Sequence, residues 1–86
     1  LKELKVAIPR ERIAQAKQTA RELGNEVWQE FPFVDGMRPM GRNNLERILN
    51  RTWRSTLSIT GVDGIPPLAS AGNVLRPKTT FKLSVR

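Results

Sequence analysis

The 86-residue sequence contains no cysteine and no histidine. Without cysteine, the chain can form neither a disulfide nor a thiolate metal site. Without histidine, it can hold neither a histidine-based catalytic triad nor most kinds of zinc site. No apolar run approaches the roughly 20 residues that cross a bilayer, and no signal-peptide pattern opens the chain. We therefore expect a cytoplasmic protein that binds no membrane and whose own residues bind no metal.

The length allows at most one small domain, which buries only a modest share of its unfolded surface. The sequence begins at Leu1 instead of methionine and stops at Arg86 inside a strand-like pattern. Both features predict that residues 1–86 are a single fragment of a larger protein, stabilised by a missing strand or by a partner.

The net charge of +7 lies entirely in the second part of the chain. Residues 1–35 hold six basic and six acidic residues, whereas residues 36–86 hold nine basic residues and two acidic ones. An anionic partner is expected at this second part. Nucleic acid, a carboxylate-bearing small molecule and an acidic surface of a parent domain all fit this charge.

Helical periodicity dominates the first half of the sequence. Apolar residues spaced by three and four predict a helix over residues 10–29, which begins after Pro9 and ends before Pro32. Gly24 and Asn25 either cap this helix at Leu23 or lie within it, and we favour one helix that is kinked at Gly24. Residues 1–8 alternate weakly and predict an extended segment. After a turn-rich stretch, Asn43 or Asn44 is expected to cap a short helix. Its apolar face consists of Leu45, Ile48 and Leu49.

Strand-like alternation dominates the second half. Residues 56–60 and 80–86 alternate apolar and polar side chains, which predicts two strands. Between them, residues 61–77 form a loop with three glycines and three prolines, and a loop of this length is usually functional or packed against something. Antiparallel pairing of the strands, with their apolar rows on the two helices, would give a two-layer α+β sandwich.

Two residues of this second half are candidates for binding a ligand. Arg86 lies on the polar row of its strand, and its planar guanidinium can bind a carboxylate through two hydrogen bonds. Asn73, in the long loop, can both donate to and accept from a peptide-like group. Each also has a structural interpretation. A strand arginine can simply be solvated, and a turn asparagine can adopt a left-handed backbone.

A third pattern surrounds Trp53. Arg51 and Arg54 flank this tryptophan, and Arg47 lies one helical turn earlier. Interleaved aromatic and basic residues can bind nucleic acid. The structural alternative is a core tryptophan beside arginines that suit the negative end of a helix dipole.

Four segments share a pattern with a known family: FVDGMRP, WRSTLSITGVDG, NVLRP and TTFKLSVR. Through them residues 33–86 resemble the lid, or dimerisation, domain of the two-zinc exopeptidases and deacylases. That family includes carnosinase, aminoacylase, acetylornithine deacetylase and succinyl-diaminopimelate desuccinylase. Residues 1–32 resemble it only weakly. The loop sequence IPPLASAG departs from the glycine-rich run that is common there, so we expect substrate preference to differ.

The resemblance implies a partial ferredoxin-like lid in which Asn73 contacts the substrate backbone and Arg86 binds the substrate carboxylate. Their spacing, 86 − 73 = 13, agrees with the family pattern. It further implies a homodimer through the lid and a dipeptide or N-acyl amino acid as substrate. The two zinc ions and the general-base glutamate belong to a separate catalytic domain. The family's lid also supplies a histidine to the oxyanion, and this chain has none.

Two other functions remain open from the residues alone. A small basic nucleic-acid-binding module would explain the charge of residues 36–86, and a domain that only oligomerises would explain the incomplete sheet. The lid hypothesis expects no nucleic acid partner and no catalysis by the fragment itself.

Overall fold

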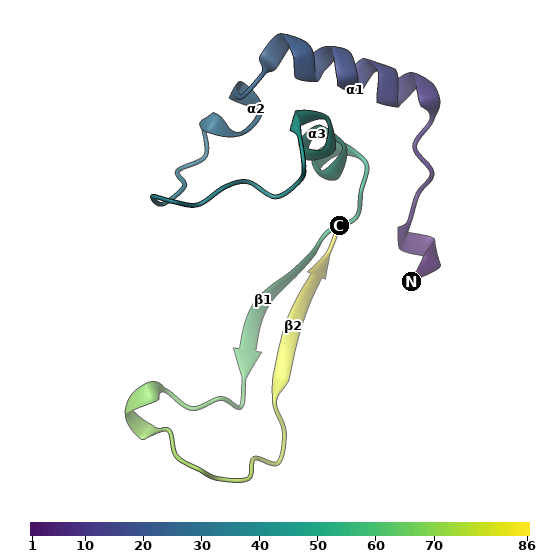
Figure 1. Ribbon diagram of the computed structural model, residues 1–86. Helices are drawn as coiled ribbons and strands as arrows, with labels where there is room; N and C mark the ends of the chain where they lie inside the picture. Colours follow the sequence, from purple (N-terminus) through teal and green to yellow (C-terminus); the bar gives the residue numbers. More distant parts are fainter. The chain divides into compact units, whose positions relative to one another are not determined.

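The computed structural model describes all residues from 1 to 86 and has an α+β fold, as expected from the sequence (Figure 1). Three α-helices precede a two-stranded antiparallel sheet. The chain divides into two compact units, Leu1–Ser55 and Thr56–Arg86. We call them the helical unit and the hairpin unit and describe each by itself.

The first predicted helix is present, but it ends at Leu23 instead of continuing to residue 29, because Gly24 caps it. Helix α1 spans Arg10–Leu23, directly after Pro9, and a short helix α2 follows over Glu26–Gln29. Gly24 separates the two with a φ of 54°, a backbone conformation that favours glycine. Its N–H donates to the carbonyl of Ala20 at 2.9 Å and so closes the last turn of α1.

Helix α3 spans Asn44–Thr52 and completes the helical unit. The side chain of Asn43 accepts a hydrogen bond from the backbone N–H of Glu46 at 2.9 Å, which confirms the predicted cap. Leu49 is only 3% exposed where α3 packs on α1, and Ala16 of α1 is buried as well. These two residues are the whole buried core of the chain, so stability depends on very few side chains.

The prediction of an extended segment over residues 1–8 was wrong for its first residues. Residues Lys2–Leu4 form a single 3₁₀ turn, η1. The N–H of Leu4 donates to the carbonyl of Leu1 at 3.2 Å, and the hydroxyl of Ser55 donates to the carbonyl of Leu4. An extended segment needs a neighbouring strand for its backbone groups, whereas a turn satisfies them locally.

The hairpin unit pairs β1, Leu57–Asp63, with β2, Thr80–Val85, in antiparallel register. Strand β1 is longer than the predicted 56–60 because a bulge between Ile59 and Gly61 absorbs one extra residue, Thr60. Past the bulge the alternation resumes. Apolar residues therefore oppose one another along the whole hairpin, in the pairs Leu57 and Val85, Ile59 and Leu83, and Val62 and Phe81.

This row of six apolar side chains forms one face of the sheet, which we call the apolar face. Each of the six is more than half exposed, so no part of Thr56–Arg86 covers them. The expectation that the row packs on helices stays a prediction. The opposite face, which we call the polar face, carries the hydroxyl-bearing and basic residues of the two strands and one acid, Asp63.

The connection between the strands, residues 64–79, contains one 3₁₀ turn, η2, at Leu68–Ser70. Gly64 begins this loop with a φ of 84°, and a Cβ placed there would lie 2.4 Å from the carbonyl oxygen of Lys78. The carboxylate of Asp63 accepts a hydrogen bond from the Gly64 N–H at 2.9 Å. Glycine is thus required at the point where the two ends of the loop meet.

Candidate functional site

The backbone of Arg86 is hydrogen-bonded to Thr56, whereas its side chain has no partner within the chain. Its N–H donates to the carbonyl of Thr56 at 3.1 Å and its carbonyl accepts from the Thr56 N–H at 2.9 Å. The side chain is exposed and makes no hydrogen bond or ion pair. It follows Val85, which lies on the apolar face, so alternation assigns it to the polar face. A guanidinium presented in this way has all of its donors free for a carboxylate.

Asn73 lies in the loop and is also exposed. The N–H of Val74 donates to the carbonyl of Gly72 at 3.0 Å, which makes Asn73 the central residue of a three-residue turn. Its backbone is not left-handed, since no residue other than glycine has a positive φ. The conformational reason for an asparagine at this position is therefore absent, and its side-chain amide makes no hydrogen bond within the chain.

The hairpin unit does not bring these two residues together. Asn73 belongs to the loop at one end of the hairpin, and Arg86 lies at the other end, beside the C-terminus (Figure 1). Strand β2 separates them, and the rise from Thr80 to Arg86 amounts to about 20 Å at the usual 3.3 Å per residue. A small ligand cannot contact both residues of one hairpin in this conformation.

A second cation, Lys82, shares the polar face with Arg86. The alternation of residues 80–86 assigns Lys82 to this face and indicates no role for it. Lys82 opposes Gly61 across the sheet, and Ser84 opposes Ser58. Two serine hydroxyls therefore lie between the two basic positions, and the residue facing Lys82 has no side chain.

The hairpin unit has an excess of positive charge that it does not neutralise. Its four basic residues are opposed by one acid, Asp63, which gives a net charge of +3. That carboxylate already accepts the Gly64 N–H, and none of the unit's basic side chains forms an ion pair. The positive field of this unit favours an anionic partner. The basic residues are Arg76, Lys78, Lys82 and Arg86.

The arginines near Trp53 are arranged differently from the predicted aromatic and basic surface. Arg47 lies over the ring of Trp28 at 5.9 Å, and Arg51 lies over Phe31 at 5.7 Å. These cation–π contacts join α3 to α2 and to the segment that follows it. The rings continue through Phe33, which meets both aromatic neighbours edge to face.

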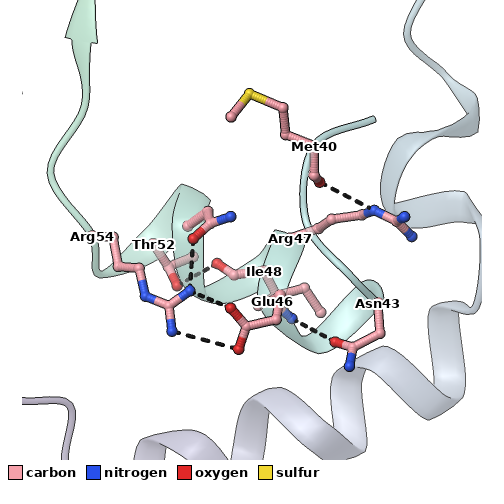
Figure 2. Close-up of polar contacts among 8 residues, drawn as sticks. Met40, Asn43, Glu46, Arg47, Ile48, Thr52 and Arg54 are labelled. Carbon is pink, nitrogen blue, oxygen red and sulfur yellow. Dashed lines mark hydrogen bonds and ion pairs between the residues drawn. The ribbon is translucent and has the colours of Figure 1, made fainter. Parts of the chain in front are cut away.

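Figure 2 shows that two of these arginines are engaged in hydrogen bonds of the helical unit. Arg54 forms an ion pair with Glu46, 2.5 Å from its Oε2, and also donates to Asn50 at 2.7 Å. Arg47 donates to the carbonyl of Met40 at 3.3 Å and to the side chain of Asn44 at 2.6 Å. These contacts tie the preceding loop and the end of α3 to the helix, so both arginines serve the fold.

The contact with Arg54 changes the pKa of Glu46. The hydrogen bond from Arg54 lowers the pKa of Glu46 from its ordinary 4.5, and the positive charges of Arg54 and Arg42 act in the same direction against the opposing effect of burial. Glu46 is thus an ionised partner in a structural contact and is unsuited to act as a general acid near neutral pH.

No group of three or more histidine, cysteine, aspartate or glutamate side chains comes together in residues 1–86 in a way that could hold a metal ion. No helix has the length and apolar character that crossing a bilayer requires. An open groove is present in the helical unit beside η1, and its polar lining consists of Lys5, Arg54 and Ser55. Arg54 is paired with Glu46 and the hydroxyl of Ser55 donates to the carbonyl of Leu4, so Lys5 is the one unpaired polar side chain of this groove.

No protein-family model matches the chain. No curated protein matches it either. The resemblance to the two-zinc peptidase lid therefore rests on the four segments quoted above and on the residues they carry. Within those segments, the side chain of Arg86 is exposed and forms no ion pair.

Proposed function

We propose that this chain is a lid and dimerisation segment of a two-zinc peptidase or amidohydrolase, in which Arg86 binds the carboxylate of a dipeptide or N-acyl amino acid. The observation that carries the proposal is the state of Arg86. Its backbone is fixed by two hydrogen bonds to Thr56, while its guanidinium is exposed and without an ion pair. The resemblance of four segments to the lid domain is the reason for proposing this family.

A fixed backbone suits an arginine that positions a substrate. The guanidinium fork binds both oxygens of a carboxylate, which sets the direction of the rest of the molecule. Because the strand end is already ordered, only the side chain loses freedom on binding. The role of Arg86 in this proposal is therefore orientation of the scissile amide, with no bond made or broken at its own atoms.

Asn73 has a different place in the same proposal. Its amide can pair with the peptide group of a substrate, but it lies at the other end of the hairpin from Arg86. We infer that the two residues meet one ligand only when the loop of residues 64–79 folds toward the sheet, or when hairpins of two subunits contribute to one site. Either lid closure or a homodimer of the larger protein would satisfy this requirement.

The residues of this chain do not fit a zinc site, because no suitable set of ligands comes together in it. In the proposal, zinc belongs to a parent catalytic domain, where it would lower the pKa of a bound water. The fragment by itself is then not catalytic. A cytoplasmic location is proposed as well, because the chain has no cysteine.

The test uses the full polypeptide that carries this segment, loaded with zinc. Arg86→Ala is expected to lower kcat/KM for dipeptides with a free C-terminal carboxylate by about 100-fold, the scale of a lost charge-assisted hydrogen bond. Dipeptides with an amidated C-terminus should show little further loss. Arg76→Ala changes a cation of the loop and is the matched control. It should show the same kcat/KM as the unsubstituted polypeptide.

Two outcomes would reject this function. One is a polypeptide that hydrolyses neither dipeptides nor N-acyl amino acids with zinc present. The other is an Arg86→Ala variant whose kcat/KM for free and amidated substrates falls by the same factor, since a carboxylate contact must distinguish the two.

A further inference from the structure

Two unpaired cations lie on the polar face of the hairpin at a fixed spacing. Lys82 and Arg86 are four residues apart on one strand line, so both occupy the same face and their Cα atoms are about 13 Å apart. Both side chains are exposed, and neither takes part in the chain's single ion pair. Long side chains at this spacing can converge on two anionic groups of one small molecule.

The surroundings of Lys82 leave its side chain free on the side of β1. Its neighbour across the sheet is Gly61, where even an added Cβ would lie 3.7 Å from the Lys82 Cβ. The hydroxyl of Thr60 donates to the carbonyl of Lys82 at 3.3 Å and holds its backbone at the bulge. The backbone of Lys82 is therefore held in place, and no side chain of the opposing residue lies beside it.

The ground between the two cations is polar and uncharged. Ser84, partly buried, opposes Ser58 between the two basic positions. Hydroxyls can donate to and accept from the amide of a bound molecule. The one acid of the unit, Asp63, lies on the same face opposite Thr80, at a position diagonal to Lys82. Its Oδ1 accepts the Gly64 N–H, and it forms no ion pair with Lys82 or Arg86.

We propose that the polar face selects substrates with two carboxylates, with Arg86 taking the carboxylate at the substrate's C-terminus and Lys82 taking a second one on its side chain. The inference rests on the proposed function and adds a substrate class to it. Arginine supplies the geometrically strict bidentate contact, and lysine supplies a point charge that tolerates variation in the second group. Acidic dipeptides and N-acylated acidic amino acids fit this arrangement.

The experiment compares N-acetylglutamate with N-acetylglutamine in the zinc-loaded full polypeptide. The two molecules have the same shape and differ by one charge, so their ratio of kcat/KM isolates the second carboxylate. The parent protein should prefer the glutamate form. Lys82→Met should lower that preference by about tenfold, as expected of one contact to a charged group, while turnover of the glutamine form changes by less than about twofold.

Two further variants separate a contact from a general effect of charge. Lys82→Arg keeps the positive charge and should retain the preference for the acidic substrate. Lys78→Met removes one positive charge from the loop, away from the polar face, and should leave the ratio unchanged. Rescue by arginine together with an inert Lys78 variant supports a direct contact at position 82.

The outcomes also separate this inference from the function beneath it. Hydrolysis that depends on Arg86 but shows the same substrate ratio in Lys82→Met and in the parent protein overturns the inference and leaves the function standing. An equal loss of preference in Lys78→Met overturns it too, because net charge then explains the result. Absence of any hydrolysis overturns both.

Discussion

The helical unit and the hairpin unit use the same kinds of side chain in opposite ways. In the helical unit, Arg47 and Arg54 are engaged by carbonyls, amides and a carboxylate, and Leu49 is almost fully buried. In the hairpin unit, Lys82 and Arg86 have no ion-pair partner, and the six residues of the apolar face are more than half exposed.

This difference separates side chains that are bonded or buried within their unit from side chains that are exposed and unpaired. Arginine in the helical unit is a structural cross-link between α3 and its neighbours. Basic residues in the hairpin unit remain available for an external anion. A hairpin of two strands is at best marginally stable in water, so we expect a neighbour to cover its exposed apolar face. Three perturbations test how far the two units differ.

The largest effect is expected from the core of the helical unit. Leu49→Ala removes the most buried side chain of α3 and should lower the free energy of unfolding by about 2–5 kcal/mol. Urea unfolding followed by the circular dichroism of the helices measures it, since all three α-helices lie in Leu1–Ser55. Leu75→Ala, at a fully exposed leucine of the loop, is the control and should change stability by less than about 0.5 kcal/mol. Equal losses in the two variants would remove the contrast between the units.

A somewhat smaller effect is expected at the base of the hairpin loop. Gly64→Ala forces a side chain into a backbone with φ of 84° and against the carbonyl of Lys78, which costs about 1–3 kcal/mol in strain alone. Cross-strand NMR contacts between β1 and β2 should weaken while the helical circular dichroism stays unchanged. Gly72→Ala meets no atom within 4 Å and has no positive φ, so it should preserve those contacts. Preserved pairing in Gly64→Ala would show that the loop base adapts.

The smallest effect is expected on the stability of the helical unit at acidic pH. The lowered pKa of Glu46 means that its contact with Arg54 stabilises the helical unit above the ordinary pKa of 4.5, and that this contribution is lost as pH falls through the folded-state value. Urea midpoints should therefore decline in this acidic range. Glu46→Gln should flatten part of the decline, whereas Glu11→Gln, on an exposed residue of α1 without an ion pair, should retain it. Identical pH profiles in all three proteins would show that the contact contributes nothing measurable.

Local patterns predicted much of this fold because their causes are local. The apolar spacing of three and four located α1. Gly24 marked the interruption of the helix, because glycine adopts a positive φ more readily than other residues. Asn43 was identified as a cap because its side chain reaches an N–H only three residues away. Alternation located both strands and assigned Arg86 to the polar face.

Features that depend on distant residues were beyond such patterns. Arg54 pairs with Glu46 eight positions earlier, and Arg51 lies over Phe31, twenty positions away. Sequence proximity had suggested Trp53 as the aromatic partner instead. The spacing of 13 between Asn73 and Arg86 carried no information on their separation in space, because half of it is an extended strand that places them at opposite ends of the hairpin.

The bulge at Thr60 has a consequence for how this protein can change in length. Removal of Thr60 would leave an unbroken alternation in which Ile59, Gly61 and Val62 keep the faces they have now, and the bulge exists because one residue more must be accommodated. At any other position of either strand, a single insertion or deletion would exchange the apolar and polar faces beyond it. Deletion of Thr60 is therefore the change in the length of β1 that keeps every apolar pair of the sheet in place.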